Sequence, residues 1–365
     1  MLRLSYSQIQ LYRSCQQAFF YRYIEGIQRK ETAVPLELGS LIHEYLANYY
    51  NNIVSKRDSA EAHADAYQRT TESWKPKLED MAETAYMVGA EETAESLRGL
   101  WEQAEYIIQR YYIVHGAEDA EQYEVILVEK QLLTKLARGI ESIGYADLVA
   151  RDRNSGYIYL FEHKTTKNPP RLETRLRDLQ TALYAKQLEM ETDIHVDGLV
   201  WNTIKTELPT IPHELKKGGF TRAQIDTTWH VYEKALLEAG VDPTEYEDMH
   251  ERLENRERTE YFPRYNYLLL GTGEILLRDY LSTAKEMAQV RRDWAKGKRE
   301  PIRAIAWQCD RCFANKLCTA AITLGGTDAV MGMYYTTRDQ RKAVAAAQDV
   351  VLKLPVAAEE YEELV

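Results

Sequence analysis

The placement of the four cysteines constrains the fold most: Cys15 lies near the N-terminus, whereas Cys309, Cys312 and Cys318 lie close together near the other end. Cytosolic chains rarely keep structural disulfides, so a metal ion or a cluster explains four cysteines better than bridges do. A site ligated by all four would close a very long loop and join the two ends of the chain into one domain. Zinc is the alternative, although structural zinc sites usually consist of two Cys-x-x-Cys pairs.

The composition is that of a globular protein with a substantial core, since 45% of the 365 residues are hydrophobic and 28% are charged. No apolar run approaches the roughly 20 residues that a membrane span requires. The first five residues, Met1 to Ser5, lack the charged and then apolar layout of a secretory signal. We therefore expect a cytoplasmic protein with no membrane partner.

The formal net charge of −11 does not exclude a nucleic-acid partner. Phosphates are bound by a local basic surface, and net charge is a poor guide to it. Basic residues gather in three places, although a solvated helix face is the commoner explanation for any one of them: Arg171, Arg175 and Arg177; Lys216 and Lys217; and Arg291, Arg292, Lys296, Lys298, Arg299 and Arg303.

The order of predicted elements indicates an α/β fold. Residues up to 122 read as helices, with apolar residues at helical spacing over 36–53. Extended segments follow at 123–133, 144–150 and 157–161, then a helix over 175–190 and a strand over 196–201. This strand–strand–strand–helix–strand order predicts a mixed central sheet flanked by helices.

We expect one domain, residues 1–325, followed by a tail, residues 326–365. Within the domain, the parts are an N-terminal helix with the first cysteine (1–30), a helical region (31–122), the α/β core (123–206), a helical insertion (207–262), a strand and long helix (263–305) and the cysteine triplet (306–325). The insertion carries a basic turn, Lys216 to Gly219, that could meet phosphates or be a lid without such contacts. Arg264 after it is a further candidate phosphate contact.

Two segments of the core carry paired carboxylates. Gly144-Tyr145-Ala146-Asp147 is followed, after 14 residues, by Glu162-His163-Lys164. In a hairpin, Asp147 and Glu162 can lie side by side, with Lys164 on the same face as Glu162 because side chains alternate along a strand. Two carboxylates and a backbone carbonyl suit Mg²⁺ or Mn²⁺, and such an ion polarises a phosphodiester and activates water. The lysine can act on that water or on the phosphate.

An isolated Asp…Glu-x-Lys pattern is loose, and a surface hairpin with an ordinary salt bridge would explain it better than an active site does. The remaining motifs change this. Together they resemble the RecB-like branch of the PD-(D/E)XK nucleases, which includes CRISPR-associated exonucleases with iron–sulfur clusters and phage-encoded relatives. The motifs, in the family's order, are Ser5-Tyr6-Ser7 with Tyr12, Cys15 and Phe20-Tyr21; Gly39-x-x-x-His43; Gly144-x-x-Asp147; Glu162-His163-Lys164; Gln180-x-x-x-Tyr184; and Cys309-x-x-Cys312-x5-Cys318.

The resemblance implies a restriction-endonuclease-like core with helical additions and an iron–sulfur clasp between the two ends. It implies that His43, Asp147, Glu162 and the main-chain carbonyl of His163 are metal ligands, although His43 could instead be a core histidine. Lys164 would be the catalytic lysine, with Asp147 and Glu162 completing the catalytic set. Gln180 and Tyr184, one helical turn apart, would hold the DNA strand. Cys15, Cys309, Cys312 and Cys318 would hold a 4Fe-4S cluster, since one cysteine plus a triplet matches the iron–sulfur members.

The expected reaction is hydrolysis of DNA phosphodiester bonds with Mg²⁺ or Mn²⁺, and the resemblance favours an exonuclease acting on single strands or ends. The chain has no Gly-x4-Gly-Lys-Ser/Thr loop, so we expect any helicase motor to come from a recombination or helicase partner. Two alternatives stay open: a non-catalytic iron–sulfur DNA-binding module that keeps the fold, and an iron–sulfur redox or repair protein. The second leaves the carboxylates and the lysine unexplained.

Overall fold

The computed structural model of the chain describes residues 2–30, 33–55, 57–87, 89–170, 179–216, 218–268 and 273–340. The chain forms two compact units. The larger unit consists of Met1–Tyr6 and Ala33–Glu286, and the smaller consists of Ser7–Thr32 and Met287–Val365. We call the smaller one the cysteine unit, because it contains all four cysteines. None of the helices that the structure describes is both long enough and apolar enough to cross a bilayer.

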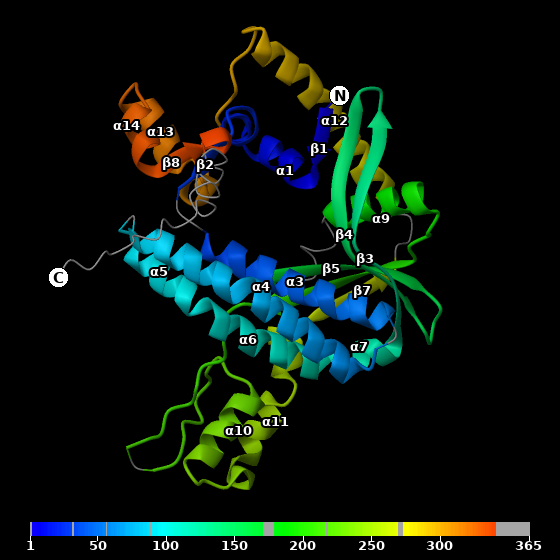
Figure 1. The fold of residues 1–365 in the computed structure, drawn as a ribbon, viewed down its shortest axis with the longest axis vertical. Helices are drawn as coiled ribbons and strands as arrows, with labels where there is room; N and C mark the ends of the chain where they lie inside the picture. The colour runs from blue at the N-terminus through cyan, green and yellow to red at the C-terminus, as the bar shows by residue number, and fades with distance from the viewer. Residues whose placement is uncertain are drawn as a thin grey trace, which may run out of the picture. The chain divides into compact units, whose positions relative to one another are not determined.

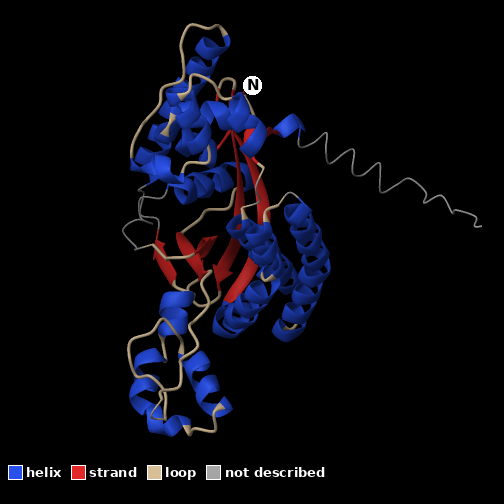
Figure 2. Ribbon diagram, turned by 90° about the vertical axis from the view of Figure 1, so that its left-hand side faces the viewer, coloured by secondary structure: helices blue, strands red, loops and turns tan. Residues whose placement is uncertain are grey.

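The larger unit is built on a six-stranded mixed sheet, drawn in red in Figure 2. Its order is β1-β4-β5-β6-β7, and β3 pairs with the remaining edge of β4. β1 is parallel to β4 and β5 is parallel to β6, whereas the other pairs are antiparallel. The strands are β1 (Leu2–Ser5), β3 (Tyr123–Ala137), β4 (Ile140–Asp152), β5 (Ile158–Thr166), β6 (Gly198–Lys205) and β7 (Arg264–Leu268). The predicted α/β fold with a mixed sheet is confirmed.

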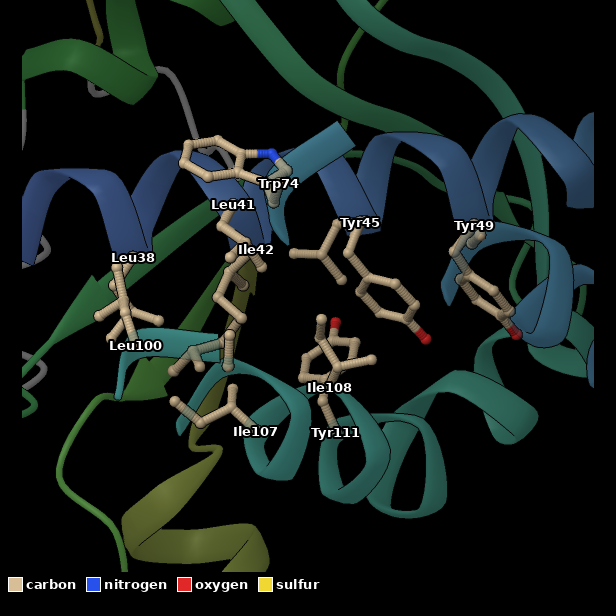
Figure 3. Packing of buried hydrophobic residues seen from close by; sticks show 14 of the residues in the cluster. Leu38, Leu41, Ile42, Tyr45, Tyr49, Trp74, Leu100, Ile107, Ile108 and Tyr111 are labelled. Carbon is tan, nitrogen blue, oxygen red and sulfur yellow. The ribbon is translucent and has the colours of Figure 1, made fainter. Parts of the chain in front are cut away.

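A layer of helices covers one face of this sheet, with α3, α4 and α6 side by side in Figure 1. The helices are α3 (Val34–Val54), α4 (Ser59–Met87), α5 (Glu91–Arg98), α6 (Leu100–Tyr111) and the short α7 (Ala117–Gln122). Apolar residues of α3 recur at helical spacing and are buried, each stabilising the fold by about 1.5–3 kcal/mol. Figure 3 shows these apolar residues of α3 packed against α6. The residues in contact are Leu38, Leu41, Ile42, Tyr45 and Tyr49 on α3 and Leu100, Ile107, Ile108 and Tyr111 on α6.

The opposite face of the sheet is covered by α9 (Leu179–Thr192) and by the first part of α12 (Gly273–Ala295). Side chains alternate along β6, so Val200 joins the core under α3 and α6, whereas the indole of Trp201 donates to Thr181 Oγ1 on α9 at 3.1 Å. On α12, the Tyr280 hydroxyl lies 3.0 Å from Ser142 Oγ of β4. Both faces of the sheet are therefore covered, as in other α/β folds.

The insertion between β6 and β7 has a small core of its own around α10 (Trp229–Glu238) and α11 (Glu247–Leu253). Both helices of this predicted helical insertion are short. α10 begins after Thr228, whose hydroxyl caps it, and Pro243 opens a separate 3₁₀ turn. Of the basic turn predicted here, Lys216 is exposed and Lys217 lies outside the described residues.

The cysteine unit combines segments from both ends of the chain. β2 (Ile27–Arg29) pairs antiparallel with β8 (Tyr335–Thr337), and Tyr21, Ile27, Leu317 and Tyr335 share a small apolar core. Its helices are α1 (Tyr6–Ser14), which begins at the boundary with the larger unit, α2 (Gln16–Phe19), α13 (Asn315–Thr323) and α14 (Asp328–Tyr334), together with the end of α12. The part of the predicted tail after residue 340 lies outside the described residues.

Candidate active site

The strands β4 and β5 separate at the position of the predicted carboxylates. They pair only between Leu148 and Arg151 of β4, whereas β5 continues along β6 to Thr166. On that edge of β4, β1 pairs only as far as Ile143, so residues 144–147 face neither strand. The side chain of Asp147 lies in this fork, where its Oδ2 accepts a hydrogen bond from the backbone N–H of His163 at 2.8 Å. The predicted hairpin is confirmed, and it brings Asp147 beside Glu162.

A second carboxylate and a histidine lie beside Asp147. His43 Nδ1, on α3, is 4.0 Å from Asp147 Oδ1 and 3.8 Å from Glu129 Oε1. One ligand atom from each of the three residues lies within 4.8 Å of the others, a spacing that could hold a metal ion. Glu129 of β3 was not among the residues predicted from the sequence. Its φ of 47° is unusual for a residue other than glycine, and strain of this kind is often found at functional sites.

Glu162 and Lys164 form an ion pair on the next strand. The Lys164 Nζ lies 2.5 Å from Glu162 Oε1 and donates a hydrogen bond to Gln180 Oε1 at 3.3 Å. Glu162 is buried, with 1% of its side chain exposed, whereas Lys164 is 35% exposed. Gln180 stands at the start of α9, so this helix fixes the direction of the lysine. The expectation that Lys164 shares a face with Glu162 is confirmed.

The crowding of carboxylates changes the acidity of the site. Burial, and then the negative charge of Glu162, raise the pKa of Asp147 to about 8. Burial lowers the pKa of His43, but Glu129 and Asp147 outweigh it, so the net shift is upward. Acidic groups held this close repel one another when ionised, and a divalent cation among them would relieve the repulsion. The donor set of carboxylates, one imidazole and a backbone carbonyl fits Mg²⁺ or Mn²⁺.

The side chain of His163 points away from Glu162, into the core beneath α3. Its ring stacks on Tyr50 at a centroid distance of 5.9 Å, and its Nδ1 lies 2.7 Å from Asn202 Nδ2 on β6. Burial lowers the pKa of His163 well below its usual value, so the imidazole is neutral. The side chain therefore anchors β5, while the backbone of the same residue lies beside Asp147.

Two glycines of the predicted motifs allow close approaches between elements. A Cβ on Gly39 would lie 2.9 Å from Thr165 Oγ1, so glycine lets α3 approach β5 one turn before His43. A Cβ on Gly144 would lie 2.2 Å from the ring of Tyr184, which covers this glycine. Tyr184 is only 7% exposed, and burial raises its pKa. Its ring thus packs on β4, one helical turn from Gln180.

The suggestion that Arg264 contacts phosphate is wrong, because its side chain is used inside the larger unit. The guanidinium forms a two-pronged ion pair with Asp119, at 2.5 and 2.7 Å, and donates to Asn202 Oδ1 at 2.9 Å and to the Tyr111 hydroxyl at 2.7 Å. Sequence reasoning could not foresee this, since Asp119 and Arg264 are 145 residues apart.

The four cysteines line one pocket of the cysteine unit, with a volume of about 300 Å³. Burial, and then the other three thiols, raise the pKa of the Cys312 thiol. Arg29 donates to the carbonyl oxygens of Phe313 and Cys312 at 2.9 and 3.0 Å, so a cation supports the loop that carries two of the thiols. No disulfide is formed by these cysteines.

The residues of this site lie within a segment that matches a known protein family. A family model described as the PD-(D/E)XK nuclease superfamily matches residues 3–319, a range that includes both carboxylates and all four cysteines. Among solved structures, the chain is similar to a protein from Eubacterium rectale described as a "Putative exonuclease". The identity is 11%, the match covers 85% of this chain and 87% of that chain, and the TM-score is 0.42. No curated protein sequence matches this chain.

Proposed function

The chain belongs to the PD-(D/E)XK nuclease superfamily, and on this basis we propose that it hydrolyses DNA phosphodiester bonds with one or two divalent cations. We propose further that it acts as an exonuclease on single strands or DNA ends. The observation that carries the proposal is the fork between β4 and β5, where Asp147, Glu162 and Lys164 meet.

The residues of the fork would have different roles in catalysis. Asp147, Glu162, His43 and the carbonyl oxygen of His163 would hold the cation, with Glu129 as a further carboxylate. The bound ion would polarise the phosphodiester and lower the pKa of the attacking water. Lys164 orients the water or stabilises charge on the phosphate, and Gln180 directs its ammonium group. Gln180 and Tyr184 would also position the strand.

The nuclease proposal is tested with linear single-stranded, circular single-stranded and duplex DNA, in Mg²⁺, Mn²⁺ or EDTA. An exonuclease degrades the linear strand in either ion, leaves the circle intact because it has no end, and is silent in EDTA. Cleavage of the circle would contradict the proposal of an exonuclease but not the proposal of a nuclease. Absence of cleavage of every substrate in both ions would overturn the nuclease proposal and favour a non-catalytic DNA-binding module.

We propose that the four cysteines hold a 4Fe-4S cluster that clasps the two ends of the chain. The support is the shared pocket, its four thiols and the composition of the cysteine unit, which is built from residues before 33 and after 286. Ligation by Cys15 and the C-terminal triplet would connect these segments and so stabilise the unit. Four thiolates also suit zinc, so the metal has to be identified by analysis.

Anaerobically purified protein should contain iron and acid-labile sulfide and absorb at roughly 400 nm, where iron–thiolate charge transfer occurs. Cys312→Ser should remove this absorbance and lower the melting temperature. Stoichiometric zinc without iron would contradict the cluster and leave the nuclease proposal untouched.

A further inference from the structure

The described part of the cysteine unit is basic, although the whole chain is acidic. Residues 7–30 and 287–340 contain 13 Lys and Arg against 6 Asp and Glu, a formal net charge of +7, which leaves −18 on the rest of the chain. Polyanions are attracted by the local potential of a surface and not by net charge. The charge distribution therefore favours the cysteine unit as the part of this protein that attracts nucleic acid.

Three of these cations follow directly on α12. Gly297, with a φ of 63°, ends the helix, and the amide of Lys298 donates to the Asp293 carbonyl at 2.9 Å. Lys296, Lys298 and Arg299 are exposed, and in the described parts of the chain none of them has a carboxylate oxygen within 4.0 Å. Unlike Arg264, these three residues form no ion pair with the described residues.

The same stretch of chain exposes large apolar side chains. Trp307 is 79% exposed, whereas Trp201, Trp74 and Trp101 in the larger unit are 0%, 2% and 6% exposed. Ile305 is 75% exposed. Tryptophan is one of the most buried residue types on average. Trp307 and Ile305 together expose apolar surface within eight residues of Arg299 in the chain, and grouped apolar exposure of this kind marks a binding surface. An exposed aromatic ring among cations is the arrangement on which unpaired bases stack.

The backbone of this stretch is held in place. The carbonyl of Ile302 accepts the amide of Gln17 at 3.1 Å, and the carbonyl of Ala306 accepts the amide of Cys309 at 2.9 Å, at the start of the 3₁₀ helix Trp307–Arg311. The main chain is therefore anchored beside the cysteines while Ile305 and Trp307 face solvent. A surface that is already ordered loses little conformational entropy when it binds.

We propose that Lys296–Trp307, which we call the docking segment, binds a single nucleic-acid strand. Trp307 stacks on a base, and Lys298 and Arg299 contact phosphates. The stacking needs an unpaired base, so the segment selects single strands over duplex. This inference rests on the proposed nuclease function, because it states where the nuclease binds its substrate.

The test measures the affinity of the full-length, cluster-loaded protein for two labelled probes in EDTA, where no cleavage occurs. One probe is an oligothymidylate, and the other is an abasic strand of equal length and charge. Trp307→Ala should weaken binding of the oligothymidylate about tenfold and leave the affinity for the abasic strand unchanged. The double variant Lys298→Gln/Arg299→Gln should weaken both and reduce the slope of log affinity against log salt by about 1.4.

Matched controls separate stacking from folding. Trp307→Phe keeps an aromatic ring and should bind the oligothymidylate nearly as the wild type does. If Trp307→Ala loses its cluster, Trp307→Phe still tests whether a ring at this position is needed for binding. Tyr86, on α4, is 59% exposed, and Tyr86→Ala should change neither affinity. Arg69→Gln/Arg98→Gln, also in the larger unit, should leave the salt slope unchanged.

Three results would overturn the inference. The first is an affinity for oligothymidylate that Trp307→Ala does not change. The second is an equal loss on both probes. The third is self-association of the wild type through Trp307. In that case Trp307→Ala would be monomeric and its affinity for DNA would be unaltered. A protein that binds strands as described but cleaves nothing in Mg²⁺ or Mn²⁺ would instead overturn the proposed nuclease function and uphold the docking segment.

Discussion

The side-chain amide of Asn202 lies 2.7 Å from Nδ1 of His163, and the same nitrogen donates to the Tyr111 hydroxyl at 2.7 Å. Its oxygen accepts from Arg264 at 2.9 Å. Asn202 thus connects the strand that carries Glu162 and Lys164 to a buried ion pair. Breaking a buried network by removing one member leaves the other groups unsatisfied, which costs more than the bond itself contributes.

Asn202→Ala should therefore lower the free energy of unfolding by about 2–4 kcal/mol. Urea denaturation followed by circular dichroism measures the change. Asn266, on the neighbouring strand β7, is exposed, and Asn266→Ala should stay within about 0.5 kcal/mol of the wild type. An equal fall in the free energy of unfolding in both variants would show that the hydrogen-bond network of Asn202 does not contribute to stability.

Gly144→Ala should disturb the site through Tyr184, because the new Cβ would lie 2.2 Å from the tyrosine ring. We expect cleavage to fall at least tenfold, since the ring covers the strand residues that precede Asp147. The clash should also lower the free energy of unfolding. Adding Tyr184→Ala removes the clash and should restore much of that free energy. Gly332→Ala, on α14 where nothing lies within 4 Å, is the control and should be neutral or slightly stabilising. Additive effects of the two substitutions would show that the ring and the glycine are not coupled.

Tyr184→Phe separates packing from strand contact at the same position, because the ring still covers Gly144 and only the hydroxyl is lost. Cleavage should fall, while cluster content and melting temperature stay near the wild-type values. Reduced stability with unchanged specific activity would make Tyr184 a packing residue only.

Glu129 combines a strained backbone with a carboxylate in the metal group, and two substitutions separate these roles. Glu129→Gly relieves the positive φ of 47° and should raise the free energy of unfolding by about 1 kcal/mol, while weakening Mn²⁺ binding. Glu129→Gln keeps the strain and loses the charge, so Mn²⁺ binding should weaken without a gain in stability. Paramagnetic resonance titration with Mn²⁺ measures the affinity. Wild-type Mn²⁺ affinity in both variants would exclude Glu129 from the metal site.

The raised pKa of Asp147, about 8, makes the stability of the metal-free protein depend on pH. Between about pH 4 and pH 8 the folded protein keeps a proton that the unfolded chain releases, so the free energy of unfolding falls as pH rises through that window. Asp147→Asn removes this linkage and should stabilise the metal-free protein by about 1–3 kcal/mol at pH 8.5, but little at pH 4. Denaturation in EDTA at both pH values measures the difference. A difference that does not change with pH would contradict the shifted pKa.

Sequence patterns predicted the central sheet because its determinants are local. The turn around Asp152 to Gly156 and the alternation on each side fix the β4–β5 hairpin, and the hairpin brings Asp147 to Glu162. The fork itself depends on the parallel pairing of β1 with β4, which joins residues 138 apart, such as Leu2 and Ile140. No local pattern specifies such a pairing.

The missed and misassigned residues have the same cause. Glu129 ends an apolar stretch of a predicted strand, where a charged residue facing solvent is the ordinary expectation, and only the pairing of β3 with β4 brings it to the site. Arg264 resembled a surface cation because its partner, Asp119, lies on α7, far away in the sequence. Partners of buried charges are set by tertiary structure, so they are the part of a site least visible in the chain.

Whether the carboxylates of the fork carry the hydrolysis is measured by the rate at which Asp147→Ala releases nucleotides from labelled linear DNA. The matched control is Asp197→Ala, because Asp197 also accepts a backbone N–H of β5, that of Ile158 at 2.8 Å, but is not one of the site residues. With equal iron content, Asp147→Ala should lose at least about 10²–10³-fold in rate and keep its affinity for DNA, whereas Asp197→Ala should cleave nearly as the wild type does. Equal cleavage by Asp147→Ala and the wild type would show that the carboxylates of the fork do not carry the hydrolysis and form only a structural ion pair.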